Sequence, residues 1–252
     1  MAVTLHVHRW GDGDLRVLLL HGITSAGSGW WRVGPDLAAR GWSVFAPDLR
    51  GHGESPMASS YRFVEYADDL RPLGSAWDAV VGHSMGAAIA VLAAEDRGFA
   101  NRLVLQDPAV VTATDVDEVL RWLLPDFEGP MTPAWVLEQY PWYHPEDARL
   151  KVLSLRQTMP EIIEQTVRDN VPWNVLAETA ALDTDTVILG SDPLAGGILP
   201  VTIGEWLATE NPRITYRVLD DAPHSAHRSK TLYDAYLTAL VDALEAGTKE
   251  DA

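Results

Sequence analysis

Residues 77–94 read WDAVVGHSMGAAIAVLAA, and this stretch decides the fold. Residues 77–81 form an apolar run with the length of a buried strand, and residues 85–94 are an alanine-rich helix candidate. Between them lies the sequence GHSMG, a G-x-S-x-G motif centred on Ser84. A serine at such a sharp strand-to-helix turn projects its hydroxyl above the edge of the sheet. The stretch therefore predicts that Ser84 is a nucleophile.

The alternation of apolar runs and amphipathic stretches continues on both sides of this segment. It predicts an α/β fold, with a mainly parallel sheet and helices on both faces. The expected strands are 16–20, 42–46, 77–81, 103–105, 186–189 and 214–219, and the expected helices are 30–40, 64–73, 85–94 and the apolar stripe 232–244.

This rhythm stops between residues 111 and 182, where seven of the 16 prolines fall. Because proline breaks long helices, the region is predicted to form several short helices that act as a cap or lid. We therefore expect a core domain of residues 1–110 and 183–252 and a cap of residues 111–182. Most aromatic residues of the cap are expected to be core, and Trp142 is the candidate for substrate binding.

Composition narrows the class of protein. With 36 acidic and 19 basic residues the formal charge is −17, which disfavours nucleic acid and anionic membrane surfaces as partners. There is no cysteine, so thiolate catalysis and cysteine-bound zinc are excluded. The N-terminus lacks the pattern of a secretory signal, and no apolar run has the length of a membrane span. We expect a cytoplasmic enzyme that needs no metal and no organic cofactor.

A serine hydroxyl is a weak nucleophile unless a base takes its proton. Of the eight histidines, His224 and His227 follow the last expected strand, on a loop that can fold back over the carboxyl edge of the sheet. His224 comes first and is the predicted base. His227 is the alternative, although we expect it to begin a helix. His83 neighbours the nucleophile and is expected to point elsewhere.

The base needs an acid that fixes its tautomer and stabilises its charge. The order serine, acid, histidine places this residue between 84 and 224. Asp192 follows the expected strand 186–189 and is the predicted acid. Asp107, in Gln106-Asp107-Pro108, ends an earlier strand and stays open as the alternative acid.

An acyl-transfer site also needs donors for the oxyanion. The sequence His21-Gly22-Ile23 follows the strand 16–20, where a loop can supply a main-chain N–H group. We predict that the N–H groups of Ile23 and Met85 form the oxyanion hole, with Met85 directly after the nucleophile.

Taken together, these motifs resemble the α/β-hydrolase superfamily, and in particular its small capped serine hydrolases. The pieces that carry the resemblance are Leu20-His21-Gly22, the run DLRGHGES at 48–55, Gly82–Gly86, Gly190-Ser191-Asp192-Pro193 and His224. The resemblance implies a doubly wound sheet with a helical cap inserted after strand six. It also implies that Asp48, Arg50 and His52 belong to a structural loop beside the active site.

Two departures from the family pattern concern the base and the acid. Pro223 precedes His224 where the family usually has glycine, and the acid segment Gly190-Ser191-Asp192 is one residue shorter than the common pattern. The shortening bears on Asp192 more than on Ser84 or His224. Dehalogenases and epoxide hydrolases of this fold use an aspartate nucleophile, so Ser84 argues against both.

The function implied is a carboxylesterase-like serine hydrolase that cleaves a small carboxylic ester or lactone through an acyl-enzyme. Carbon–carbon bond hydrolysis and cofactor-free perhydrolysis by the same triad are the alternative reactions. A hydrolase fold recruited as a ligand receptor is the alternative of another class, because a fold alone does not decide function.

Overall fold

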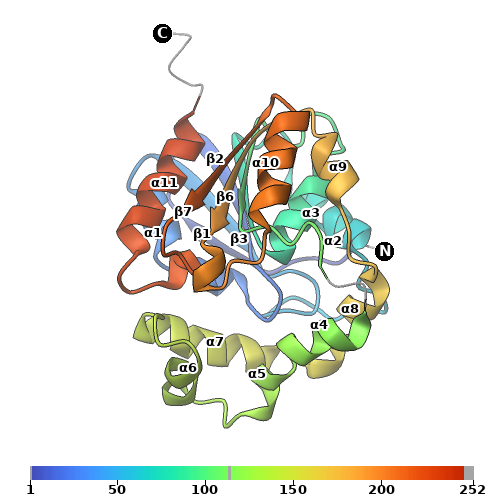
Figure 1. The fold of residues 1–252 in the computed structure, drawn as a ribbon, viewed down its shortest axis with the longest axis vertical. Coiled ribbons are helices and arrows are strands. Elements are labelled where there is room, and N and C mark those ends of the chain that lie inside the picture. Colours follow the sequence, from blue (N-terminus) through green and yellow to red (C-terminus); the bar gives the residue numbers. More distant parts are fainter. Residues whose placement is uncertain (1, 113–114, 247–252) are drawn as a thin grey trace.

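The computed structural model of the chain describes residues 2–112 and 115–246. Its centre is a seven-stranded sheet with helices on both faces (Figure 1). The strands are β1 (Val7–Trp10), β2 (Leu15–Leu20), β3 (Trp42–Pro47), β4 (Ala79–His83), β5 (Arg102–Gln106), β6 (Asp185–Ser191) and β7 (Ile214–Leu219). Their order across the sheet is β1-β3-β2-β4-β5-β6-β7. β1 runs antiparallel to β3, and the other neighbouring pairs are parallel.

Helices cover both faces of this sheet. One face carries α1 (Val33–Ala38) and α11 (Tyr233–Glu245), and the other carries α2 (Phe63–Leu70), α3 (Met85–Ala93) and α10 (Val201–Glu210). Short 3₁₀ helices lie at Gly27–Trp30 (η1), Arg71–Leu73 (η2), Pro193–Ala195 (η3) and Ala226–Arg228 (η4). The doubly wound α/β fold expected from the sequence is confirmed.

The central strands are largely apolar because successive side chains point to opposite faces of the sheet and both faces are covered by helices. Val17 and Leu19 of β2 belong to the core under α1 and α11. Leu18 and Leu20 belong to the core under α2, α3 and α10. All four side chains are fully buried. Burial on both faces of the sheet explains why residues 17–20 of β2 are all apolar.

The order of the strands reverses beside β2, which lies between β3 and β4. In open parallel sheets, ligands bind at such a switch point, beyond the carboxyl ends of the strands. Leu20 of β2 is paired with Gly82 of β4, so the segments that follow these two residues start side by side. They are His21-Gly22-Ile23 and the turn at Ser84, which positions both at the switch point.

The segment between β5 and β6 is helical. It forms α4 (Val116–Leu123), α5 (Pro125–Glu128), α6 (Pro133–Gln139), α7 (Pro145–Gln157), α8 (Pro160–Asn170) and α9 (Leu176–Ala180). Helices α5 to α8 each start with a proline, which the first turn of a helix tolerates because its N–H group is unpaired there. The expectation of several short helices is thus confirmed.

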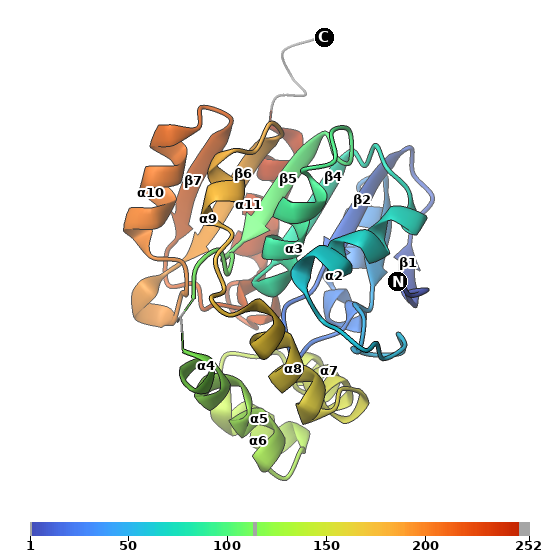
Figure 2. The same ribbon diagram turned by 90° about the vertical axis from the view of Figure 1, so that its right-hand side faces the viewer.

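Helices α4 to α8 gather at one end of the molecule, whereas α9 lies beside α3 and α10 (Figure 2). The expected insertion point after strand six is wrong by one strand. The helices follow β5, which is the fifth strand. Only one strand, β1, comes before β2 along the chain, so the count is one lower than expected. The division into a core domain and a cap domain stays a prediction. None of the helices in the described part of the chain is long and apolar enough to cross a membrane.

Candidate active site

Ser84 lies at the expected turn between β4 and α3. Its φ of 54° and ψ of −117° belong to a region that residues with a side chain rarely adopt. Its N–H donates to the Gln106 carbonyl at 3.1 Å, and its carbonyl accepts from the Ala109 N–H at 3.2 Å. Backbone strain persists only where the surroundings over-determine it, and these bonds hold the turn in place. The turn lets the Ser84 side chain face a cavity although the residue is 6% exposed.

The two glycines of the motif are required by close contacts. A Cβ on Gly82 would lie 2.5 Å from Cα of Ala87, and a Cβ on Gly86 would lie 2.4 Å from the Leu20 carbonyl oxygen. Both distances are shorter than any van der Waals contact, and the atoms concerned are main-chain. Glycine at both positions therefore lets α3 begin directly against the ends of β2 and β4.

The main-chain donors expected for an oxyanion lie beside this turn. Ile23 lines the same cavity as Ser84, and Met85 is the first residue of α3. Within residues 2–112 and 115–246, neither N–H group has a hydrogen-bond acceptor. The first N–H groups of a helix are left unpaired by its geometry and attract negative charge. The two N–H groups are therefore available to a ligand atom.

His224 meets Asp107, not Asp192. Nδ1 of His224 lies 2.6 Å from Oδ2 of Asp107, whose side chain is fully buried. The Asp107 carboxylate also accepts three main-chain N–H groups, those of Ser191 at 3.3 Å, Ile198 at 3.0 Å and Leu199 at 3.2 Å. These hydrogen bonds hold the Asp107 carboxylate in position beside His224. Asp107 can therefore fix the Nδ1–H tautomer of His224 and stabilise its positive charge.

The expectation that Asp192 orients the base is corrected by this geometry. Oδ1 of Asp192 accepts the Leu194 N–H at 2.8 Å, and Oδ2 accepts the Asp221 N–H at 3.1 Å. Asp192 is thus the N-cap of η3, directly after β6 ends at Ser191. The short segment after β6 turns at once into η3, which leaves the carboxylate to its own turn. Asp107, the alternative from the sequence, takes the place beside His224.

His227 is part of the core. Its Nδ1 lies 2.9 Å from Nε2 of Gln106, its Nε2 accepts a hydrogen bond from Arg228, and its ring stacks on Trp30 at 4.6 Å. Burial, followed by the charge of Arg228, holds the pKa of His227 well below its usual range. His227 does not line the cavity that Ser84 faces, whereas His224 does, which favours the choice of His224.

His83 has a role that the sequence did not reveal. Its Nε2 lies 3.0 Å from the carbonyl oxygen of His224, and the two rings lie 4.6 Å apart. Burial keeps the pKa of His83 well below its usual range, so the ring is neutral and can donate to that carbonyl. His83 therefore holds the main chain of the base, where we expected it to point away.

Several of the residues described so far line one cavity of about 540 Å³. Ser84, Ile23 and His224 line it on the side of the sheet. On the helical side it is lined mainly by apolar and aromatic residues, namely Val119, Trp122, Leu123, Tyr140, Trp142, Tyr143 and Trp173. Trp142, the residue predicted to bind substrate, lines this cavity. Its buried Nε1 has no hydrogen-bond partner in the described part of the chain. The volume suits a small molecule.

Comparison with known proteins gives this arrangement a family. The model of the family described as "Alpha/beta hydrolase family" matches residues 17–235, which is most of the chain. The chain belongs to the alpha/beta hydrolase family. A curated relative, Lipase LipV of Mycobacterium tuberculosis, is 40% identical over 139 residues, which are 52% of this chain and 52% of the relative. The chain thus matches about half the length of that relative.

Solved structures of alpha/beta hydrolases have the same fold over their whole length. The hydrolase of E-2-(acetamidomethylene)succinate has a TM-score of 0.81 at 20% identity, covering 97% of this chain and 96% of that one. The esterase EaEST of Exiguobacterium antarcticum has a TM-score of 0.78 at 18% identity, covering 96% of each chain. At these identities the likeness concerns the fold.

The loop 48–55 of this hydrolase is structural, as the resemblance implied. Arg50 forms a bidentate ion pair with Asp69 at 2.6 and 2.8 Å, and both side chains are buried. The Leu49 N–H donates to Nε2 of His21 at 3.0 Å. Nδ1 of His52 lies 2.9 Å from the Arg50 carbonyl oxygen. Burial lowers the pKa of His21 to about 3 and that of His52 to about 4, so both rings are neutral parts of the scaffold.

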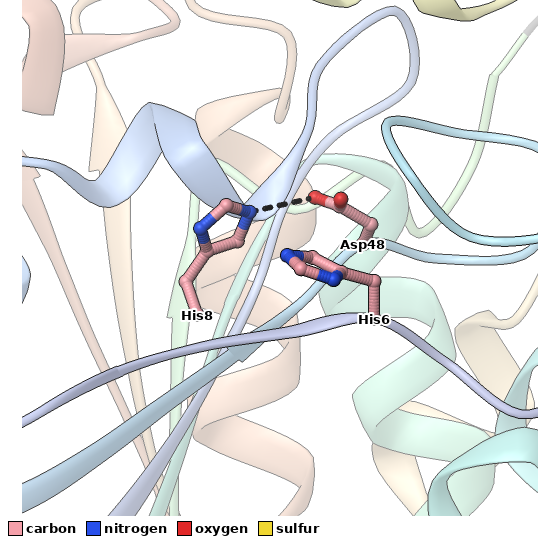
Figure 3. A group of neighbouring side chains, drawn as sticks. All are labelled: His6, His8 and Asp48. Carbon is pink, nitrogen blue, oxygen red and sulfur yellow. Dashed lines mark ion pairs between the residues drawn. The ribbon is translucent and has the colours of Figure 1, made fainter.

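One group of side chains in the described ranges has the composition of a metal site. His6, His8 and Asp48 have potential ligand atoms within 4.8 Å of one another, with His8 Nε2 3.3 Å from Asp48 Oδ1 (Figure 3). The two oxygens of Asp48, however, already accept the N–H groups of Gly27 at 2.7 Å and Glu54 at 2.8 Å. None of the three residues lines the cavity. We assign the group to the fold of the loop 48–55.

A buried ion pair ties the helical region to the oxyanion loop. Nζ of Lys151 on α7 lies 2.5 Å from Oδ2 of Asp126 and donates to Thr24 Oγ1 at 2.6 Å and to the Thr24 carbonyl at 3.3 Å. Tyr140 donates to the other oxygen of Asp126 at 2.8 Å. Thr24 has a positive φ of 59° and follows Ile23 directly. Lys151 therefore fixes a strained residue next to a candidate oxyanion donor, which no sequence motif indicated.

Proposed function

We propose that the protein is a serine hydrolase that cleaves a small carboxylic ester or lactone. Ser84 is the nucleophile, His224 the general base, and Asp107 the acid that orients the base. The observation that carries the proposal is the contact of 2.6 Å between His224 Nδ1 and Asp107 Oδ2, made by a histidine that lines the same cavity as Ser84. That the substrate is a small molecule and that the protein acts in the cytoplasm both stay predictions.

The first half of the reaction forms an acyl-enzyme. Asp107 keeps the proton of neutral His224 on Nδ1, so Nε2 can accept the proton of Ser84. Oγ of Ser84 then bonds to the carbonyl carbon, and the carbonyl oxygen becomes an oxyanion stabilised by the N–H groups of Ile23 and Met85. When the tetrahedral intermediate collapses, His224 gives its proton to the leaving alcohol.

The second half restores the enzyme. A water molecule gives a proton to His224 and attacks the acyl carbon, and the same two N–H groups stabilise the second oxyanion. His224 returns the proton to Ser84 as the acid product leaves. The apolar helical wall limits the water in the cavity, which strengthens the electrostatic interactions at the reacting atoms.

Labelling with a fluorophosphonate tests the nucleophile. We expect one adduct, mapped by mass spectrometry to Ser84, and no adduct in Ser84→Ala. Ser59→Ala is the matched control, because Ser59 is exposed and does not line the cavity. An adduct on another serine, or none on the wild type, would contradict the proposal. It would also favour the reading of the fold as a ligand receptor.

A panel of p-nitrophenyl esters of several acyl lengths tests the reaction, beside a peroxide-dependent assay. We expect turnover in water with no requirement for peroxide. Turnover that needs peroxide would instead assign the same triad to perhydrolysis.

A further inference from the structure

A buried cation at the wall of the cavity has no directly bound counter-ion among the described residues. Arg228 is the last residue of η4, lines the cavity and is 5% exposed. Its guanidinium donates to Oγ of Ser25 and, at 3.3 Å, to Nε2 of His227. Neither acceptor is charged, since burial keeps the pKa of His227 well below its usual range. Among the described residues, no carboxylate oxygen lies within 4.0 Å of the Arg228 nitrogens.

The other buried basic side chains of the described chain are paired. Arg50 has Asp69 at 2.6 Å, and Lys151 has Asp126 at 2.5 Å. Pairing is the usual condition for burying a charge, because an isolated buried ion loses its hydration without compensation. Arginine cannot avoid the loss by giving up its proton. Arg228 is therefore a buried charge at the wall of the cavity that has neutral hydrogen-bond acceptors but no carboxylate in direct contact among the described residues.

A carboxylate of the protein does not fill this place. Burial raises the pKa of Asp147 to about 6, and the nearby positive charge of Arg228 acts in the opposite direction. Asp147 is instead paired with Arg32 at 3.3 Å and does not line the cavity. The ring of Tyr143 lies 5.5 Å from the Arg228 guanidinium carbon, a cation–π contact that is weaker than an ion pair.

Arg228 also lies near the reacting groups. It follows His224 by four residues, and its partner Ser25 follows the candidate oxyanion donor Ile23 by two. Trp142 also lines the cavity, and its buried indole N–H has no hydrogen-bond partner among the described residues. Trp142 precedes Tyr143, which is paired in a β-bridge with Ser229, the residue after Arg228. Both donors thus belong to adjoining segments of the cavity wall.

We propose that the cavity accepts an ester-like substrate that carries a carboxylate, such as a half-ester of a dicarboxylic acid, and that Arg228 pairs with this carboxylate. The inference rests on the proposed ester hydrolysis at Ser84 and adds the class of substrate. The planar fork of a guanidinium matches a carboxylate with two parallel hydrogen bonds, which lysine cannot reproduce. Arg228 is then a specificity-determining residue, and the reaction releases a dicarboxylic acid.

The kinetic test compares two esters that differ in one charge. Mono-p-nitrophenyl glutarate carries a free carboxylate, and its methyl ester is the neutral counterpart. We expect the wild type to prefer the anionic ester in kcat/KM. In Arg228→Gln the ratio of the two kcat/KM values should fall about 10- to 100-fold, the range of a hydrogen bond to a charged group. In Arg228→Lys the ratio should lie between those of the wild type and Arg228→Gln. This more conservative variant keeps the test available if Arg228→Gln does not fold.

Lys230→Gln is the matched control. It removes one positive charge from the same loop, but Lys230 is exposed, donates to the Pro141 carbonyl and does not line the cavity. Its ratio should equal that of the wild type. If the two Arg228 variants lose kcat/KM equally on both esters, or the wild type shows no preference for the anionic ester, Arg228 only braces the loop and the inference is overturned.

A binding experiment separates this inference from the proposed function. Monomethyl glutarate and dimethyl glutarate are titrated by calorimetry into Ser84→Ala and into Ser84→Ala combined with Arg228→Lys or Arg228→Gln. We expect the anionic ligand to bind more tightly, and the difference to shrink with Arg228→Lys and vanish with Arg228→Gln. This result would support the anion subsite even if the wild type hydrolysed neither p-nitrophenyl ester, whereas equal binding of both ligands would overturn it.

Discussion

Asp107 and His224 are 117 residues apart in the chain, yet their side chains meet at 2.6 Å. The strand order explains the contact. β5 is the neighbour of β4, and Asp107 follows β5 by one residue as Ser84 follows β4 by one residue. The loop with His224 comes from β7 and is held over β6, where Ser191 Oγ donates to the Pro223 carbonyl at 2.9 Å. Ser84 and Asp107 therefore lie at the ends of adjacent strands, and His224 is brought to them.

The two histidines of this loop should respond differently to alanine. His224→Ala should abolish turnover with little change in the free energy of unfolding, because the His224 side chain is 30% exposed. His227→Ala should instead destabilise the fold by about 2 kcal/mol, since it removes the buried ring that contacts the Gln106 amide and accepts from Nε of Arg228. Urea unfolding and kcat on one activated ester check both. Similar mild losses of kcat in the two variants would contradict the assignment of the base.

Lys151 should affect catalysis through the oxyanion loop. Lys151→Met should lower kcat about 10-fold by freeing Thr24 and Ile23, because small displacements of positioned groups are costly. It should also lower stability by about 3 kcal/mol, since the Asp126 carboxylate is left buried and unpaired.

The double variant Lys151→Met with Asp126→Asn separates these two effects. It should recover stability, because the orphaned charge is gone, but not kcat. Recovery of both would mean that Lys151 acts on stability alone. Urea unfolding and initial rates on the same preparations make the comparison.

The side chain of Trp142 should influence substrate preference. Trp142→Ala enlarges the cavity at its helical wall, so we expect kcat/KM to shift toward longer acyl chains. Trp135→Ala is the matched control, because Trp135 lies in the same helical region but does not line the cavity. An ester series of increasing length measures the shift. An unchanged preference in Trp142→Ala would assign the ring to packing alone.

Stability should fall in mild acid because buried histidines stay neutral in the fold. Burial lowers the pKa of His21 to about 3 and that of His52 to about 4, so the unfolded chain takes up these protons first, near pH 6.5. Their contribution is complete above that pH and falls by about 1.4 kcal/mol per pH unit for each as the pH decreases toward 4. Asp147 opposes the trend below its raised pKa of about 6.

Urea unfolding at about pH 7 and about pH 5 measures this dependence. The free energy of unfolding should be lower at the acid pH, and His52→Gln should reduce the slope by about the share of one proton. Equal free energies at the two pH values would mean that these rings do not resist protonation in the fold.

The sheet and the turn at Ser84, the candidate nucleophile, could be predicted from the sequence because both depend on local patterns. The strands are short apolar runs, and the turn at Ser84 needs glycines within two residues on either side, so both features can be read from neighbouring letters. The insertion could also be recognised, since four of its prolines start helices. The location of each helix relative to the sheet could not, because it depends on the order of the strands.

The sequence left two candidates, Asp192 and Asp107, for the carboxylate that contacts His224, and it favoured Asp192. Asp107 and Asp192 both follow a strand, and a linear pattern cannot tell which carboxylate reaches His224. The decision came from local geometry, because Asp192 is used as a cap while Asp107 is held by three N–H groups. Lys151 and Arg228 were missed for a related reason. The partners of Lys151, Asp126 and Thr24, lie more than 20 residues away along the chain, and so does Ser25, one of the two partners of Arg228.

The most direct measurement for the proposed triad is kcat on one activated ester for Asp107→Asn and Asp192→Asn, with the fold checked by circular dichroism. Asparagine keeps the shape but loses the charge and tends to hold His224 in the wrong tautomer, so Asp107→Asn should lower kcat by roughly 10⁴-fold, the loss known for the equivalent change in a serine protease. Asp192→Asn should keep kcat near the wild-type value, because Asp192 only caps η3. Near-normal turnover of Asp107→Asn, with a collapse in Asp192→Asn, would contradict the account.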